Sequence, residues 1–571
     1  MKLIYFSDCG KRLWTAAIVS FLGPLSVVAQ QPAGKLARPT PEQAAWQDME
    51  LEMFLCLDPC TWQNVEYDNH TTPLSEINPE KLDTDQWARV AVSMGARQIL
   101  FVAKHTGGFC WWQTETSKYG VKETPWRGGR GDVIADLSKS CREHGLRLGI
   151  YLSSTDDFHK ATAGRCKTPE AQQAYTKVYR RQLTEVLSRY GEVSEIWFDG
   201  GMILEVRDII EKHAPHAVIF GAPPACRNQI RWVGNEEGYS AYPNWNAVRR
   251  EDLLSGKAHG TTGDPNGEEW MPVEVNTVNV HPHYWFWKPD APNRKLRSLD
   301  ELLSCYYHSV GRGGVFLLNM TPDTSGLIPE ADAAQAAEFG QEITRRFAKS
   351  IAETSGQGNV LELALNKPTR IDHVVTMENI LEGERVREYV IEGLVSGQWK
   401  ELCSGTSIGH KKIDQFSPTE VSKVRWRCLK SAAEPQIRKL AAYSVGDTAK
   451  AAPVAPQTTD AARKVWEWSL ETVGEQWKTV DIDLTPFCKD ACQYQIDVNC
   501  TGGNPLEIQS LQYVFDGTVL PEFVHKAAPD VARYYLTVTG LGKPLALRAV
   551  VRGPGDKKDS RGTIAIRKRP L

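Results

Sequence analysis

The stretch Glu195-Ile-Trp-Phe-Asp-Gly-Gly201 is a short apolar run that ends abruptly in a carboxylate followed by two glycines. Similar β-branched or aromatic runs recur along the chain, and longer amphipathic segments separate them. This alternation is typical of βα units that build a parallel sheet. The predicted strands cover residues 53–58, 98–104, 147–153, 195–199, 217–221, 231–236, 273–277 and 315–319. Because eight is the strand number of the (β/α)8 barrel, we predict an α/β fold of that type, with a doubly wound open sheet as the alternative.

The predicted strands share a second property, which is that the best-defined ones end in polar residues. These strand-end side chains are Asp58, Lys104, His105, Ser153, Asp199, Glu236 and Asn319. In a (β/α)8 barrel the active site lies at the C-terminal ends of the strands, so we expect these side chains to converge on a catalytic site. The predicted helices around the barrel cover residues 84–94, 132–144, 170–190, 204–213 and 298–310.

The pattern of the sequence changes after the barrel segment, which we assign to residues 30–350. Residues 351–447 contain short alternating runs separated by turn residues, and so do residues 463–571. Alternation of this kind predicts two all-β sandwich domains. Residues 448–462 are rich in Ala, Pro and Thr, a composition that predicts a linker between the two domains.

Composition and charge narrow the class of function. The chain has 571 residues, of which 41% are hydrophobic and 24% are charged, and its formal net charge is −3. This balance fits a folded globular protein and offers no positive surface to nucleic acid. Residues 1–29 combine Lys2, Lys11 and Arg12 with an apolar run that ends in small residues. They predict a signal peptide cleaved near Ala29, and therefore a secreted or periplasmic protein with no membrane anchor.

Carboxylates at strand ends can carry out glycoside hydrolysis. A carboxylate in that place can attack the anomeric carbon of a sugar, and Asp199 fits the role of this nucleophile. A second carboxyl group must protonate the leaving oxygen, which is otherwise a poor leaving group. Glu236 and Glu274 both lie at predicted strand ends, and Glu237 is a third candidate. The residues by themselves leave the choice among these three open.

Several motifs occur in an order that resembles glycoside hydrolase family 29, the retaining α-L-fucosidases. They include Leu82-Asp-Thr-Asp-Gln-Trp87, Val102-Ala-Lys-His-Thr-Gly-Gly-Phe109, Gly149-Ile-Tyr-Leu-Ser153, the Trp-Phe-Asp-Gly string and Ser309-Val-Gly-Arg-Gly-Gly-Val-Phe-Leu-Leu-Asn319. The resemblance implies that Asp199 is the nucleophile. It also implies that Glu236, in a Trp-x-Gly-Asn-Glu string typical of the branch that acts on α-1,3/4-linked fucose, is the acid/base. Glu274 is then the second choice and Glu237 the third, and the resemblance implies no metal or cofactor.

The resemblance further implies which residues contact the sugar. These are Glu66, Tyr67, His105, Tyr151 and Trp285, with Trp111 and Trp112 as an apolar wall. Three positions depart from the family pattern, because Cys56, Thr106 and Gly107 stand where the family has two His and one Asp. Loss of two imidazole groups leaves the identity of the sugar open, since a polar site discriminates by hydroxyl pattern.

These observations predict a secreted exo-α-L-fucosidase that releases terminal fucose, with α-1,3 or α-1,4 linkages favoured, from fucosylated oligosaccharides or glycoconjugates. The first C-terminal domain resembles the discoidin-type, carbohydrate-binding-module-like sandwiches that commonly follow this barrel. One alternative is an α-L-galactosidase or a hydrolase of substituted fucose on the same scaffold. The other is a catalytically inactive glycan-binding protein.

Overall fold

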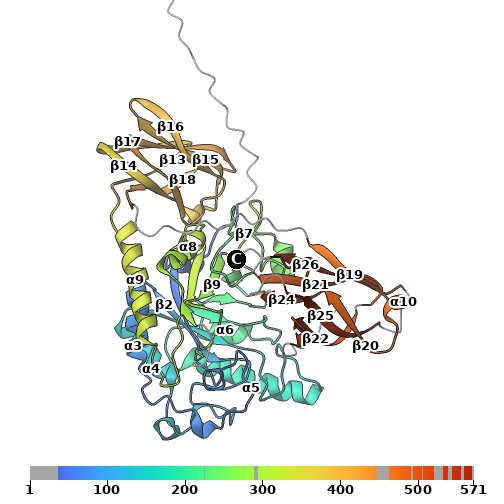
Figure 1. Ribbon diagram of the computed structural model, residues 1–571. Coiled ribbons are helices and arrows are strands. Elements are labelled where there is room, and N and C mark those ends of the chain that lie inside the picture. The colour runs from blue at the N-terminus through green and yellow to red at the C-terminus, as the bar shows by residue number, and fades with distance from the viewer. Residues whose placement is uncertain are drawn as a thin grey trace, which may run out of the picture.

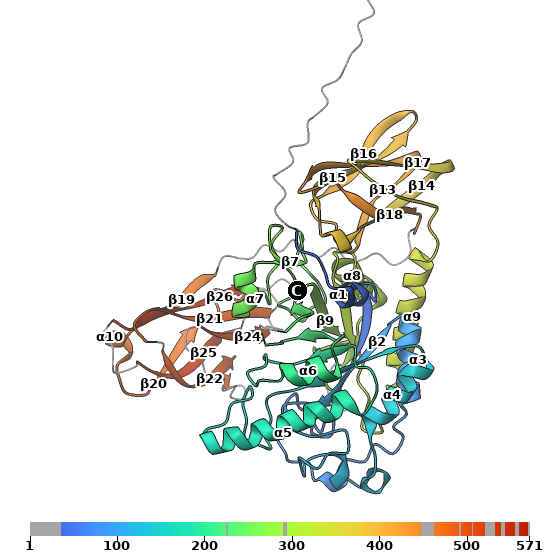
Figure 2. The same cartoon turned by 180° about the vertical axis from the view of Figure 1, so that it is seen from behind.

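The chain folds into a barrel followed by two β-domains, which lie on different sides of the barrel (Figures 1 and 2). The computed structural model describes residues 36–223, 226–288, 294–446, 462–489, 493–504, 506–519, 531–537, 543–553 and 559–568. The predicted signal peptide and all but the last residue of the predicted linker therefore lie outside the described residues.

Eight parallel strands form a closed barrel in the order β1-β12-β9-β6-β5-β4-β3-β2. Their bounds are β1 (Leu51–Leu55), β2 (Gln98–Lys104), β3 (Arg147–Leu152), β4 (Glu195–Trp197), β5 (Val218–Phe220), β6 (Gln229–Trp232), β9 (Val273–Val278) and β12 (Val315–Asn319). Each predicted strand corresponds to one of these, so the prediction of a (β/α)8 barrel is confirmed and the alternative of an open sheet is wrong. The remaining strands of this region form two short pairs, β7 (Ala247–Val248) with β8 (Glu269–Trp270), and β10 (Val280–His281) with β11 (Lys295–Leu296).

Helices surround the barrel, and several begin where the sequence provides a capping side chain. The α-helices of this region are α1 (Pro41–Gln47), α2 (Cys60–Gln63), α3 (Thr84–Met94), α4 (Val133–Glu143), α5 (Pro169–Ser188), α6 (Arg207–His213), α7 (Arg250–Ser255), α8 (Leu299–Ser309) and α9 (Glu330–Phe347). Short 3-10 helices are η1 (Leu74–Glu76), η2 (Val121–Glu123) and η3 (Trp126–Gly129). The side chains of Asp83, Asp132, Thr168 and Ser298 each accept a backbone N–H in the first turn of the helix that follows. Such caps satisfy donors that have no partner inside the helix, which fixes where it starts.

The two faces of each barrel strand pack against different cores. Along β2, Ile99 and Phe101 belong to the large core between strands and helices, together with α3 residues such as Trp87. Leu100 and Val102 belong instead to the core inside the barrel. This period of two follows from the pleat of a strand, which places successive side chains on opposite faces. The sequence therefore decides, residue by residue, which side chains can reach the interior of the barrel.

The first C-terminal domain is a six-stranded antiparallel sheet in the order β13-β18-β14-β17-β15-β16. The strands are β13 (Ala352–Gln357), β14 (Val360–Glu378), β15 (Val386–Val395), β16 (Gln398–Gly405), β17 (Lys412–Ser431) and β18 (Gln436–Tyr443), with η4 (Ile380–Glu382) after β14. β14 and β17 are long and shift their mutual register twice, so this one hydrogen-bonded sheet encloses a core that includes Tyr389 and Trp426. The sheet is joined to the barrel by buried polar contacts, because Asn246 donates two hydrogen bonds to Glu384, at 3.0 and 2.8 Å.

The second C-terminal domain consists of two four-stranded antiparallel sheets, β19-β26-β21-β24 and β20-β25-β22-β23. Its elements are β19 (Arg463–Ser469), α10 (Leu470–Val473), β20 (Lys478–Asp483), β21 (Gln493–Gly502), β22 (Glu507–Phe515), β23 (Thr518–Val519), β24 (Val531–Thr537), β25 (Leu545–Arg552) and β26 (Arg561–Lys568). A core that includes Trp468, Ile496 and Leu547 is shared by the two sheets, as the predicted sandwich requires. Within the described ranges, no helix is both long enough and apolar enough to span a bilayer.

Candidate active site

A cavity of about 360 Å³ opens at the C-terminal ends of the barrel strands, where the fold places active sites. Its lining residues are Phe54, Cys56, Glu66, Tyr67, Val102, His105, Tyr151, Trp197, Asp199, Glu236, Asn276, His283, Trp285 and Phe286. They come from β1, β2, β3, β4, β9 and from the loops that follow these strands and β6. Seven residues predicted from the sequence are among them: Asp199, Glu236, Glu66, Tyr67, His105, Tyr151 and Trp285.

Asp199 follows β4 and is held in place by a neighbouring strand. The hydroxyl of Tyr151, on β3, donates a hydrogen bond of 2.9 Å to Oδ2 of Asp199. Burial raises the pKa of Asp199, while the hydrogen bonds from Tyr151 and from the backbone of Gly200 lower it. Gly200 and Gly201 have φ angles of 67° and 81°, a conformation that side chains other than glycine rarely adopt. The two glycines thus let the chain turn away directly after the carboxylate, and two donors favour its charged form.

Glu236 lies in a more open environment than Asp199. Its side chain is 46% exposed, and its Oε2 accepts a hydrogen bond of 3.3 Å from Nε1 of Trp285. Nε2 of His283 lies 3.2 Å from the same oxygen. The charge of Glu236 contributes to the raised pKa of Asp199. The two carboxyl groups therefore interact across the cavity, and the exposed one has access to solvent.

Aromatic rings form a continuous stack along one side of the cavity. Tyr67 lies on His105 with ring centres 6.0 Å apart, and His105 lies 5.9 Å from Tyr151. Tyr151 is 5.2 Å from Trp197, which in turn stacks on Phe220 at 3.8 Å. The angles between successive rings are 28° or less. Such a surface can bind the C–H face of a sugar while a few polar groups read its hydroxyls.

Glu66 joins two loops at the rim. Its Oε2 accepts a hydrogen bond of 3.0 Å from the backbone N–H of Trp285, and its Oε1 lies 3.0 Å from the ammonium group of Lys288. The same ammonium group lies 3.9 Å from the ring centre of Tyr284. Glu66 therefore fixes the loop that supplies Trp285, in addition to lining the cavity.

Two predicted alternatives for the acid/base are not among the residues that line this cavity. Glu274 is 0% exposed inside the barrel beside Glu52 and Glu195, with ligand-type oxygens of the three within 4.8 Å of one another. Its two carboxyl oxygens accept the N–H of Nε1 of Trp197, at 3.2 and 3.3 Å. Glu274 therefore holds one ring of the aromatic stack in place from deeper in the barrel. Burial and the charge of Glu195 raise the pKa of Glu274 well above its usual range. Glu237 points its backbone carbonyl toward the thiol of Cys305, at 3.8 Å.

The prediction that Trp112 lines the sugar pocket is wrong. Its side chain is 0% exposed and packs in the core between the barrel and its helices, as does that of Trp111. Nε1 of Trp112 donates a hydrogen bond of 3.1 Å to Glu185 on α5. The reason is that the chain folds back after β2, where the N–H of Trp111 donates to the carbonyl of Ala103. Both indoles are thereby placed outside the barrel.

Several cavity residues were not identified from the sequence. Asn276 lies two positions beyond Glu274 on β9 and so shares its face, but one layer nearer the mouth. His283 and Phe286 come from the loop after β10, and the string His281-Pro282-His283 is the signal in the sequence for His283. Its two His diverge, since Nε2 of His281 contacts Glu301 at 2.8 Å instead of facing the cavity.

A second cavity of about 430 Å³ adjoins the first and shares Trp197, Asp199, Glu236 and Asn276 with it. Its other walls include Phe220, Trp232 and His259. The indole N–H of Trp232 donates to Asn276 at 3.0 Å, which fixes the ring at the boundary. The two carboxyl groups therefore lie where the two cavities meet.

Comparison with known proteins agrees with this geometry. A family model described as alpha-L-fucosidase matches residues 29–345. The chain belongs to the α-L-fucosidase family. It is 32% identical to alpha-L-fucosidase 1 of Arabidopsis thaliana over 470 residues, which are 73% of this chain and 90% of that protein. As a member of this family, the chain is a glycoside hydrolase.

Solved structures extend the α-L-fucosidase likeness to the fold. A candidate α-L-fucosidase from Bacteroides thetaiotaomicron is 34% identical, with a TM-score of 0.67, and the match covers 72% of this chain and 99% of that one. A glycoside hydrolase 29 family member from an unknown rumen bacterium is 26% identical, with a TM-score of 0.65. That match covers 94% of this chain and 100% of the other, so the likeness includes the β-domains.

The three departures from the α-L-fucosidase pattern have distinct structural settings. Cys56 lines the cavity, where the buried thiol replaces an imidazole. Thr106 Oγ1 lies 3.4 Å from Nδ1 of His105. A Cβ atom on Gly107 would lie 2.3 Å from Oδ2 of Asp68, so the carboxylate of Asp68 fills the space that a side chain at position 107 would need. Oδ2 of Asp68 also accepts the hydroxyl of Tyr119 at 2.6 Å.

Proposed function

We propose that this protein is a retaining exo-α-L-fucosidase in which Asp199 is the nucleophile and Glu236 the acid/base. The observation that carries the proposal is the unequal environment of the two carboxyl groups in one cavity. Asp199 is half-buried and receives two hydrogen bonds that favour its charged form. Glu236 is 46% exposed and can exchange protons with water. A nucleophile that stays ionised and an acid that can be re-protonated are the two roles that double displacement needs.

The reaction then proceeds in two steps at the anomeric carbon. In the first, a carboxylate oxygen of Asp199 forms a bond to C1 while the bond from C1 to the leaving oxygen breaks, and Glu236 gives its proton to that oxygen. In the second, Glu236 takes a proton from water, the water oxygen bonds to C1, and the ester to Asp199 breaks. Tyr151 stabilises the carboxylate of Asp199 both before attack and when it leaves.

The two cavities suggest how a terminal sugar and its leaving group are accommodated. The first cavity, with its aromatic stack, takes the fucosyl ring. The second, lined by Phe220 and Trp232, takes the sugar to which fucose is attached. Because Asp199 and Glu236 lie on the boundary, the scissile bond spans both cavities. This arrangement favours removal of single terminal residues.

The linkage and the compartment are part of the same proposal. The Trp-x-Gly-Asn-Glu string that contains Glu236 favours α-1,3- and α-1,4-linked fucose. Cys56 lines the cavity, and its thiol is a weaker hydrogen-bond partner for a sugar hydroxyl than an imidazole. An α-L-galactoside or a substituted fucoside is therefore the competing substrate. Residues 1–29 have the charge and apolar pattern of a signal peptide, so the enzyme is exported and the peptide is removed by cleavage near Ala29.

Covalent trapping tests the central assignment. A 2-fluoro-fucosyl fluoride should label the protein once, and peptide mapping should place the adduct on Asp199. Labelling of another carboxylate, or none while the substrate is still hydrolysed, would overturn the assignment. The sugar is tested in parallel by measuring monosaccharide release from α-1,2-, α-1,3-, α-1,4- and α-1,6-fucosylated oligosaccharides beside an α-L-galactoside. Faster release of galactose than of fucose would favour the competing substrate.

A further inference from the structure

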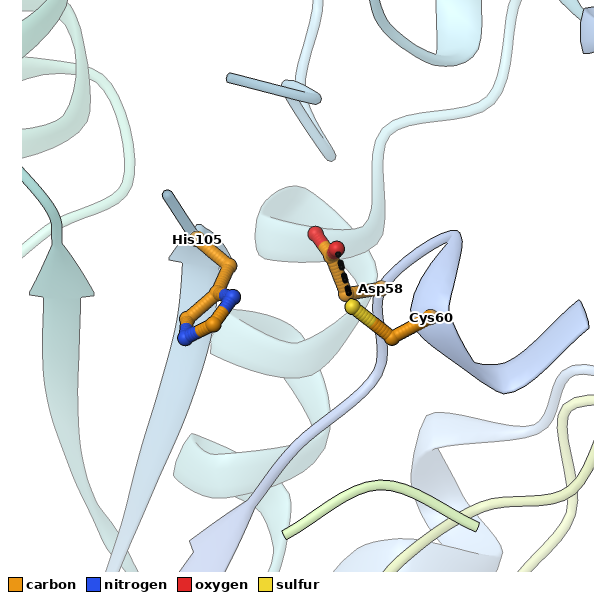
Figure 3. A group of neighbouring side chains, drawn as sticks. All are labelled: Asp58, Cys60 and His105. Atoms are coloured by element: carbon orange, nitrogen blue, oxygen red, sulfur yellow. Dashed lines mark hydrogen bonds between the residues drawn. The ribbon is translucent and has the colours of Figure 1, made fainter. Parts of the chain in front are cut away.

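Three buried side chains with metal-ligand chemistry meet at the edge of the sugar cavity. Asp58 follows β1, Cys60 is the first residue of α2, and His105 follows β2. β1 and β2 are parallel neighbours, so their C-terminal ends lie side by side and bring the three residues together. Figure 3 shows the ring of His105 facing the thiol of Cys60 and the carboxyl group of Asp58. One donor atom from each lies within 4.8 Å of the others.

The carboxyl group of Asp58 is incompletely satisfied. Asp58 and Cys60 are both 0% exposed, and the thiol donates to Oδ2 of Asp58 at 3.2 Å. The other oxygen, Oδ1, is buried and has no hydrogen-bond partner within the part of the chain that the structure describes. An unpaired buried carboxylate oxygen is costly, because it has lost water without gaining a donor. A bound cation would satisfy it.

The surrounding charges also favour a cation. The carboxyl group of Asp68 acts electrostatically on both Asp58 and Cys60, and that of Glu66 acts on Cys60. A dication at this point would add the positive charge that these acidic neighbours lack, and a neutral imidazole would offer it a lone pair.

We propose that Asp58, Cys60 and His105 form a zinc site at the edge of the sugar cavity. One sulfur, one nitrogen and one oxygen ligand match the preference of zinc, whereas magnesium and calcium prefer oxygen ligands. Zinc ligands at tetrahedral angles stand about 3.3–3.8 Å apart, so donors that already lie within 4.8 Å need only small movements. Three protein ligands leave a fourth position for water or a sugar hydroxyl.

Such an ion would control how His105 meets the sugar. His105 lines the cavity, and its two ring nitrogens face different surroundings. Coordination through one nitrogen leaves the proton on the other, which then acts as a hydrogen-bond donor. The site would thereby fix the tautomer of His105, close to the positions where Cys56 and Thr106 replace two imidazoles of the family pattern. Neither Asp199 nor Glu236 belongs to this site, so zinc binding is independent of the roles assigned to those two residues.

The test is metal binding by the full-length protein without sugar. After treatment with a chelator and addition of zinc, the wild-type protein should retain about one zinc per chain through gel filtration. Cobalt(II) in its place should give the intense thiolate-to-metal charge-transfer absorption that marks a sulfur ligand. Cys60→Ala should remove that absorption and the retained zinc. Cys141→Ala, which deletes another buried thiol, should keep both.

A second variant covers the case in which Cys60→Ala does not fold. Asp58→Asn keeps the size of the side chain and should weaken zinc binding by at least about tenfold. Its melting temperature in chelator should match that of wild type, while the increase on adding zinc should be lost. The proposal is overturned if wild type retains no zinc, if cobalt gives no thiolate absorption, or if folded Cys60→Ala or Asp58→Asn binds zinc as tightly as wild type.

Discussion

The barrel contains two sets of carboxyl groups in very different surroundings. At the mouth, Asp199 and Glu236 line the cavity and receive hydrogen bonds from Tyr151 and Trp285. Deeper inside, Glu52, Glu195 and Glu274 are all 0% exposed and lie close together. Burial raises the pKa of all three, and their mutual repulsion raises those of Glu52 and Glu274 well above the usual range. Glu52 and Glu274 are therefore held largely protonated.

This difference teaches that a carboxyl group becomes catalytic through its donors and its access to solvent. Position on a barrel strand does not suffice, because Glu274 is the second residue of β9, near the amino end of the strand, and lies below Trp197. Removing a mouth carboxyl should therefore cost activity, and removing a deep one should change mainly the pH dependence of stability.

The largest effect is expected from the nucleophile. Asp199→Ala should lower kcat/KM for an aryl fucoside by about four orders of magnitude or more, because no covalent intermediate can form. Steady-state rates on the purified variant measure this, with circular dichroism to verify folding. A variant within tenfold of wild type would remove Asp199 from the mechanism.

The acid/base should show an effect that depends on the leaving group. Glu236→Ala should slow release from a fucosylated oligosaccharide by about 10²- to 10⁴-fold, and activated aryl fucosides much less, because only the former need protonation. Added azide should restore turnover of the aryl substrate and yield a fucosyl azide. The matched control is Glu237→Ala, the next residue in the chain, which should show neither the leaving-group dependence nor the rescue.

A smaller effect should come from the donor to the nucleophile. Tyr151→Phe should lower kcat/KM by about 10- to 100-fold, the range expected for one hydrogen bond to a charged group. That hydrogen bond lowers the pKa of Asp199, so its loss should raise the pKa. The acid limb of the pH profile of kcat/KM should therefore move to higher pH. An unmoved limb would show that Tyr151 does not act on the charge of Asp199.

The smallest effect on turnover is expected in the deep set. Glu274→Gln keeps an acceptor for Trp197 and should leave kcat nearly unchanged. In the folded protein the raised pKa values keep protons on Glu52 and Glu274. In the unfolded chain the same carboxyl groups lose their protons above their ordinary pKa. The free energy of unfolding of the wild-type protein should therefore fall as pH rises from about 5 toward 8. The variant should reduce that slope, by up to about 1.4 kcal/mol per pH unit for one proton. Urea unfolding at several pH values measures it, and parallel slopes would contradict a protonated Glu274.

The sequence predicted the barrel well because each strand carries its own local signal. All eight runs became strands. Of the polar residues at their ends, His105, Asp199 and Glu236 line one cavity, whereas Asp58, Lys104, Ser153 and Asn319 are buried and do not line it. Depth inside the barrel was not predictable, because Glu274 and Asn276 share a face and differ only in layer, which depends on register with β6 and β12.

Loop residues were the second source of error. Trp112 follows β2 closely in the chain, and only the fold-back onto Ala103 shows that it packs outside the barrel. His283 lies 47 residues after Glu236 in the chain and reaches it from a loop, a contact that spacing cannot reveal. Long-range packing, not local propensity, decides such positions.

The contact between Asn246 and Glu384 makes the barrel depend on the first β-domain. Glu384 belongs to the first β-domain, and its charge also acts on Arg231, which is 0% exposed on β6. A protein that stops near residue 350 would leave the buried guanidinium of Arg231 without this carboxylate, five residues before Glu236. The first β-domain and the catalytic barrel therefore form one structural unit.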